Sequence, residues 1–103
     1  MGTTPPRTQD LEEKRYHIGK LPSKISRFIR RQPKEIQRRI AAAFDYIRQS
    51  PFEHPNPTVI KPMRGQFRGC LRYRIDNIRF IYRVEKETRV ISILEIDNRG
   101  DIY

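Results

Sequence analysis

Two neighbouring segments in which apolar and basic residues alternate constrain the fold more than any other part of the chain. Residues 71–75 read Leu-Arg-Tyr-Arg-Ile, and residues 78–84 read Ile-Arg-Phe-Ile-Tyr-Arg-Val. A period of two is typical of β-strands that bury one face. Asp76 and Asn77 both tolerate positive φ, so they favour a two-residue turn between the strands. The sequence therefore predicts a β-hairpin in which Arg74 lies directly opposite Arg79.

Basic side chains gather on one face of this predicted hairpin. Arg72, Arg74 and Arg79 share that face, and residues 61–83 hold seven Lys or Arg against a single acid, Asp76. Like charges opposed across strands cost about 0.2–1 kcal/mol per pair, so an external anion should compensate. The whole chain carries a formal net charge of +10, and guanidinium groups bind phosphate through charge-assisted, paired hydrogen bonds. Nucleic acid is the partner that these features favour.

The residue types available limit the chemistry that such a site can perform. Arginine stays protonated because its pKa exceeds about 12, so it stabilises charge but does not accept a proton. The two histidines, His17 and His54, fall in separate segments, and a paired-histidine mechanism has no support. The single cysteine, Cys70, and the scattered acids suggest neither a thiolate zinc site nor a two-metal site. We therefore expect no metal and no cofactor.

Two amphipathic helices are predicted before the hairpin. Pro22 suits the opening of the first helix, which stops near Gln32. Pro33 is acceptable at the start of the second, and Pro51 ends it because its ring disfavours helical geometry at the preceding residue. The second helix carries an apolar stripe with helical spacing, formed by Ile36, Ile40, Ala43, Phe44 and Ile47.

The remaining segments complete a single domain over residues 16–103. Residues 16–18 predict a short first strand, and the nearly continuous apolar run at 90–96 predicts a central strand covered on both faces. Residues 51–65 contain four prolines, which predict a long loop rather than a central strand. Because loops of this length in compact domains are more often functional than incidental, we expect this one to have a functional role. Residues 1–15 are polar and aperiodic, and we interpret them as a disordered tail.

Membrane insertion and export are not expected from this sequence. No apolar run approaches the roughly 20 residues that span a bilayer, and the N-terminus lacks the hydrophobic stretch of a secretory signal. We therefore expect a cytoplasmic protein.

Four segments in order resemble the RelE branch of the RelE/ParE toxin superfamily. They are Lys61-Pro62-Met63-Arg64-Gly65, the two hairpin strands at 71–75 and 78–82, and the closing Arg99-Gly100-Asp101-Ile102-Tyr103. The resemblance covers residues 16–103. It implies an α+β fold of the RelE-like microbial RNase type, with two N-terminal helices packed on an antiparallel sheet of about four strands.

The resemblance also implies a function. RelE-like toxins of type II toxin-antitoxin systems enter the ribosomal A site and cut messenger RNA there without a metal ion. The 2′-hydroxyl of the RNA attacks the adjacent phosphate, which gives a 2′,3′-cyclic phosphate and a 5′-hydroxyl. The implied partners are a RelB-like antitoxin with an acidic segment, in a hetero-oligomer, and the messenger and ribosomal RNA of the A site.

Individual residues match positions of that family. Arg72 and Arg74 match a basic pair on the second strand, where relatives often have lysine. Arg79 and Arg99 match the phosphate-binding and leaving-group arginines, and Tyr103 matches a terminal tyrosine that stacks on the messenger. These five are the expected catalytic residues. The residues expected to contact RNA elsewhere are Lys24, Arg27, Arg30, Arg31, Arg38, Arg39, Lys61, Arg64 and Arg68.

Two other functions stay open at this point. A ParE-like toxin would inhibit DNA gyrase by binding, without nuclease activity. A non-catalytic, basic RNA-binding protein would also account for the charge. Arg99 and Tyr103 favour the nuclease, because a protein that only blocks gyrase has no evident need for them, whereas net charge does not separate the three.

Overall fold

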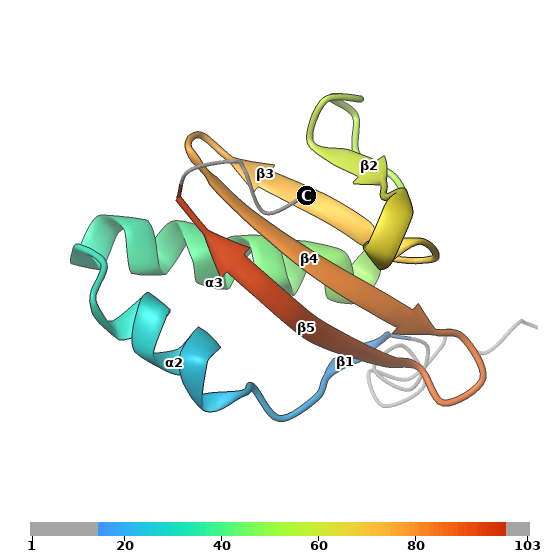
Figure 1. Ribbon diagram of the computed structural model, residues 1–103, viewed down its shortest axis with the longest axis horizontal. Helices are drawn as coiled ribbons and strands as arrows, with labels where there is room; N and C mark the ends of the chain where they lie inside the picture. The colour runs from blue at the N-terminus through green and yellow to red at the C-terminus, as the bar shows by residue number, and fades with distance from the viewer. Residues whose placement is uncertain (1–14, 99–103) are drawn as a thin grey trace, which may run out of the picture.

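Five strands form one sheet in the order β1-β5-β4-β3-β2, and two helices lie against one of its faces (Figure 1). The computed structural model describes residues 15–98. Their elements are, in order, β1 His17–Ile18, α2 Ser23–Arg30, α3 Lys34–Gln49, β2 Ile60–Pro62, the 3₁₀ turn η1 Gly65–Phe67, β3 Leu71–Ile75, β4 Ile78–Glu85 and β5 Val90–Asp97. Residues 1–14, which make up nearly all of the tail predicted at 1–15, lie outside the described part. Residues 99–103 also lie outside it.

The β3–β4 hairpin has the register predicted from the sequence. Tyr73 pairs with Phe80, Ile75 with Ile78, and Arg74 with Arg79. Asp76 has a φ of 51° in the turn, which an aspartate tolerates. The alternation of residue types therefore places the arginines on one face and the aromatic side chains on the other.

The predicted α+β fold with two helices on a sheet is confirmed, but the sheet is mixed and has five strands. β1 pairs with β5 in parallel, whereas the other pairs are antiparallel. β2 occupies residues 60–62 of the segment predicted to be a loop. β2 is an edge strand, where the missing N–H of Pro62 does little harm because no further strand has to pair with it.

A bulge in β5 explains its nearly continuous run of apolar residues. Tyr82 pairs with Ile93, but its neighbour Ile81 pairs with Glu95, so the register shifts by one residue at Leu94. The shift lets Ile93 and Ile96 both pack on the helix side, while Leu94 packs on the opposite side. β5 lies next to β4 and is bordered on its other edge by the two-residue β1.

The main core lies between the helices and the sheet. Ile25 of α2 and Ile40 and Ile47 of α3 are almost fully buried there against Phe80 and Tyr82 of β4. The ring of Phe80 also stacks on Tyr73 at 5.1 Å between centroids. The arginines of β3 and β4 are therefore carried by strands whose other face is firmly packed.

A smaller apolar cluster lies on the helix-free face of the sheet. Met63, Cys70 and Ile81 are buried together, with Phe67 and Leu94 packed against them. The segment from β2 through η1 to β3 thus covers part of that face beside the arginines. Cys70 is a buried free thiol in this cluster.

Candidate functional site

β2, β3 and β4 place four adjoining basic residues on the helix-free face of the sheet, and Arg83 lies further along β4 on the same face. Lys61 pairs with Arg72 across β2 and β3, and Arg74 pairs with Arg79 across β3 and β4. Directly paired residues of antiparallel strands share a face, and residues two apart on one strand share it as well. We call Lys61, Arg72, Arg74 and Arg79 the cationic face. Two pairs of like charges therefore oppose each other within it.

Arg72 and Arg79 each hold a buried guanidinium nitrogen without an acceptor. Arg72 is only 8% exposed, and neither its Nε nor the Nε of Arg79 has a hydrogen-bond partner among the described residues. Leaving a buried donor unsatisfied costs about 1–3 kcal/mol, and more for a charged group. The fold therefore keeps both arginines in place at a cost to its own stability.

The guanidinium groups of Arg72 and Arg74 have neutral partners. Arg72 Nη2 donates to the carbonyl oxygen of Thr58, and Arg74 Nη2 donates to the Thr58 hydroxyl at 3.0 Å. No carboxylate of residues 15–98 forms an ion pair with Arg72 or Arg74. Asp97 of β5 is the cross-strand partner of Arg79 and lies beside it on the same face. Even with that carboxylate beside Arg79, the four cations leave the face with a net positive charge.

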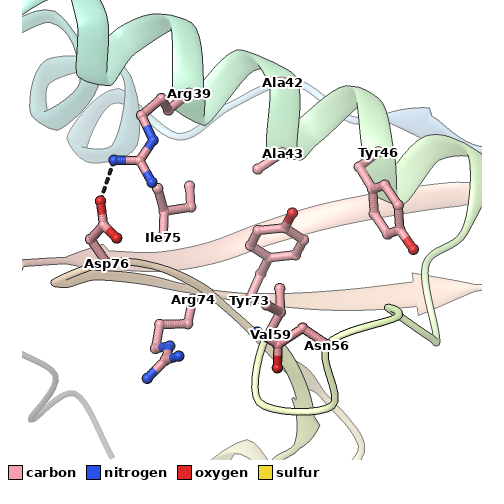
Figure 2. A pocket seen from close by; sticks show the side chains of 10 residues that line it. All are labelled: Arg39, Ala42, Ala43, Tyr46, Asn56, Val59, Tyr73, Arg74, Ile75 and Asp76. Carbon is pink, nitrogen blue, oxygen red and sulfur yellow. Dashed lines mark hydrogen bonds and ion pairs between the residues drawn. The ribbon is translucent and has the colours of Figure 1, made fainter.

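Asp76, the single acid of residues 61–83, has its ion-pair partner on α3. It forms an ion pair with Arg39 at the end of the hairpin turn (Figure 2). The hydrogen bond from Arg39, and then its charge, hold the pKa of Asp76 below its usual range. Arg39, which the sequence assigned to RNA contact, thus lies on the helix side in an internal ion pair.

A pocket adjoins the cationic face on the side of β2. It has a volume of about 450 Å³ and is lined by Lys61, Pro62, Met63, Arg64, Gly65 and Arg72. Lys61 and Arg64 are exposed at this pocket, and Arg68 is exposed just after η1. Lys61 and Arg64 therefore lie close to Arg72, where a nucleotide that reached the arginines would also meet them.

The basic residues of the two helices lie apart from the cationic face. Arg27, Arg30, Arg31 and Arg38 are exposed on the helix layer. Lys24 is engaged with Glu95 of β5, with 2.7 Å between Nζ and Oε1. A second pocket of about 350 Å³ lies beside this ion pair, and Arg27 and Arg31 line it. The structure therefore divides the predicted RNA-binding set between two surfaces.

Arg99 and Tyr103, which complete the predicted catalytic set, lie outside the described residues. Of the histidines, His17 is exposed in β1, and His54 accepts the N–H of Asn56 in the proline-rich loop. Within residues 15–98, no cluster of His, Cys, Asp and Glu side chains is arranged to hold a metal ion. No helix in that same part of the chain is long and apolar enough to cross a membrane.

The sequence did not predict that Thr58, and Asn56 two residues before it, lie beside the arginines of β3. Both belong to the loop before β2, and Oδ1 of Asn56 accepts from the N–H and the hydroxyl of Thr58. The signal was the Asn-Pro-Thr triplet at 56–58, because an Asn side chain commonly caps the backbone two residues on. The contact with β3 left no trace in the sequence.

Comparison with known proteins places these residues in a family. Residues 17–103 match the family model described as the ParE toxin of the type II toxin-antitoxin system parDE. Toxin RelG of Mycobacterium tuberculosis is 37% identical over 43 residues, which make up 42% of this chain and 49% of RelG. The chain thus spans about half the length of this curated relative.

Solved structures with the same architecture confirm the fold. The toxin-antitoxin complex RelBE2 of Mycobacterium tuberculosis has a TM-score of 0.66 at 24% identity, covering 82% of this chain and 99% of that one. The archaeal RelE-RelB complex of Pyrococcus horikoshii has a TM-score of 0.68 at 26% identity, covering 84% and 97%. The isolated RelE toxin of E. coli has a TM-score of 0.64 at 15% identity, covering 82% and 85%.

Proposed function

The chain belongs to the RelE/ParE superfamily of type II toxin-antitoxin toxins, and we propose that it is a ribosome-dependent endoribonuclease that cuts messenger RNA in the A site. The observation that carries this proposal is the cationic face, on which Lys61 lies directly opposite Arg72 and Arg74 lies directly opposite Arg79. Opposed cations, kept at a cost in stability, suit a site that binds a phosphodiester.

The chemistry follows from what arginine can and cannot do. The 2′-oxygen of one nucleotide forms a bond to the adjacent phosphorus, and the bond from phosphorus to the 5′-oxygen breaks. The attacking hydroxyl loses its proton to water or to a base, and the leaving oxygen takes up a proton. Arg72, Arg74 and Arg79 stabilise the extra negative charge on the pentavalent phosphorus, since a guanidinium does not act as a base. The products are a 2′,3′-cyclic phosphate and a 5′-hydroxyl.

The partners in this proposal follow from charge and from the relatives. The RelBE2 and RelE-RelB structures are complexes of a toxin with its antitoxin. For this chain we propose a RelB-like antitoxin with an acidic segment, in a cytoplasmic hetero-oligomer. Arg27, Arg30, Arg31 and Arg38 of the helix layer would contact ribosomal RNA while the cationic face holds the messenger.

A second candidate function is inhibition of DNA gyrase. The family model that matches the chain is the one for ParE toxins, and a gyrase inhibitor needs no phosphodiester site. The two functions differ in what accumulates when the toxin is induced. A nuclease leaves cut messengers and stalled ribosomes, whereas a gyrase inhibitor leaves intact messengers and trapped gyrase-DNA complexes.

The test is cleavage of a defined messenger on purified ribosomes with the purified chain. We expect cuts at the A-site codon with 2′,3′-cyclic phosphate ends, and at least a hundredfold loss of rate in Arg79→Ala, because one transition-state donor contributes about 10²–10³-fold. Arg83→Ala is the matched control, since Arg83 lies on the same strand and the same face but is exposed and pairs with Ser92 rather than with a cation. Absence of cutting by the wild-type chain, together with gyrase inhibition, would select the second function.

A further inference from the structure

Arg72 and Arg74 both donate to a single residue of the proline-rich loop before β2. Nη2 of Arg72 donates to the carbonyl oxygen of Thr58, and Nη2 of Arg74 donates to its hydroxyl oxygen at 3.0 Å. Two cations on one strand therefore share one neutral acceptor residue. A neutral acceptor orients a guanidinium group without cancelling the charge that a phosphate would need.

Asn56 fixes Thr58 and determines the direction of its hydroxyl group. Oδ1 of Asn56 lies 3.0 Å from the backbone N of Thr58 and 2.8 Å from its Oγ1. A backbone N–H only donates, so the Asn56 atom that it meets must be the amide oxygen. The single hydroxyl proton of Thr58 is therefore committed to Asn56, and the lone pairs of Oγ1 are available to Arg74.

The loop that carries Thr58 is anchored to the helix side of the sheet. Asn56 donates its N–H to Nδ1 of His54 at 3.0 Å, and the His54 ring lies 4.8 Å from that of Tyr46 on α3. Figure 2 shows Asn56 on the loop beside β3, with Tyr73 directed towards α3 and Arg74 directed away from it. The loop thus links the packed side of the sheet to the cationic face.

We propose that Thr58 is a positioning residue, which fixes Arg74 through its hydroxyl and Arg72 through its carbonyl before RNA binds. The inference rests on the proposed function for its consequence in catalysis. A guanidinium group that is already oriented loses less freedom on binding and meets the phosphate in the productive geometry. Thr58 is exposed and lies outside the strands, so a change in its side chain leaves the core intact.

The decisive variant is Thr58→Val, which removes the hydroxyl and keeps the shape of the side chain. On saturating ribosomes we expect its single-turnover cleavage rate to fall about tenfold, because misplacement of a catalytic group by about 1 Å costs up to a hundredfold. Affinity for the ribosome should stay unchanged. Thr58→Ser retains the hydroxyl and should recover most of the rate. In an Arg74→Ala background, Thr58→Val should have no further effect, since its target is gone.

Two results would overturn the inference: a wild-type rate in Thr58→Val, or the same loss of rate whether or not Arg74 is present. If the wild-type chain cuts no messenger, the proposed function fails, and NMR relaxation of the Arg74 Nε–H group then decides the positioning role separately. Increased mobility of Arg74 in Thr58→Val but not in Thr58→Ser would support it, with Arg72 unchanged as the internal control. Equal mobility of Arg74 in all three proteins would refute it.

Discussion

Arg72 of the cationic face combines burial with two features that lower the stability of the fold. The residue is 8% exposed, its Nε has no acceptor within the described chain, and Lys61 lies directly opposite. We expect Arg72→Met, which retains an unbranched apolar stem, to raise the free energy of unfolding by about 1 kcal/mol because it removes the unsatisfied donor and the opposed charge. Urea denaturation measures the change.

The matched control for this substitution is Arg83→Met. Arg83 is exposed on β4, and we expect its replacement to change the free energy of unfolding by no more than about 0.5 kcal/mol. Arg72→Met should at the same time weaken binding of single-stranded RNA. A loss of stability in Arg72→Met would mean that the hydrogen bond to Thr58 outweighs the unsatisfied donor, and that Arg72 is a structural residue.

The sequence predicted the features of the site that follow from local patterns, but not the contacts between residues far apart in the chain. Alternation within β3 and β4 was enough to place Arg72, Arg74 and Arg79 on one face, because strand geometry dictates it. The bond between Thr58 and Arg74 spans 16 residues, and the ion pair between Arg39 and Asp76 spans 37. Neither has a local pattern, so the sequence indicated neither the contact of Thr58 with β3 nor the ion pair of Arg39.

The secondary structure elements show the same dependence on local signals. The β3–β4 hairpin has a turn sequence and a period of two, and its register was predicted correctly. The bulge at Leu94 and the parallel pairing of β1 with β5 arise from packing between distant segments, and no local pattern indicates them. β2 was not predicted because it contains Pro62 and follows three other prolines, yet a strand at the edge of a sheet tolerates a residue that a central strand excludes.

The proline-rich loop is the element whose anchoring can be tested directly. The hydroxyl of Tyr82, a fully buried residue, donates to the carbonyl of Pro51 at 2.6 Å. Burial raises the pKa of Tyr82, so the phenol stays protonated and remains a donor at neutral pH. We expect Tyr82→Phe to lower the free energy of unfolding by about 1–3 kcal/mol, since it leaves the Pro51 carbonyl without this donor. Thermal or urea unfolding measures the loss.

Tyr46→Phe provides the comparison within the same loop. The hydroxyl of Tyr46 donates to the carbonyl of Glu53 at 2.9 Å, but this bond is exposed. Water can replace the lost donor there, so we expect the smaller loss of stability of the two substitutions. Equal losses in both variants would indicate that the phenol groups contribute through packing of their rings rather than through the loop carbonyls.

The distribution of charge over the molecule separates two surfaces that could meet different strands of RNA. Lys61, Arg72, Arg74 and Arg79 lie on the helix-free face, whereas Arg27, Arg30, Arg31 and Arg38 lie on the helix layer. An oligonucleotide of a few residues is too short to reach both faces of the sheet at once. The affinity for an oligonucleotide should therefore depend on the basic residues of one face, whereas the affinity for a ribosome should depend on those of both faces.

The salt dependence of binding distinguishes these surfaces. We plot the logarithm of the binding constant of a tetranucleotide against the logarithm of the salt concentration. If the tetranucleotide binds Arg72, Arg74 and Arg79, the slope of this plot should be about −2, because each neutralised phosphate of a single strand contributes about −0.7. Arg79→Ala should make the slope shallower by about 0.7, whereas Arg27→Ala on the helix layer should leave it unchanged. Fluorescence anisotropy at several salt concentrations measures both slopes. An equal change in the two variants would mean that the oligonucleotide binds the net charge of the protein rather than the cationic face.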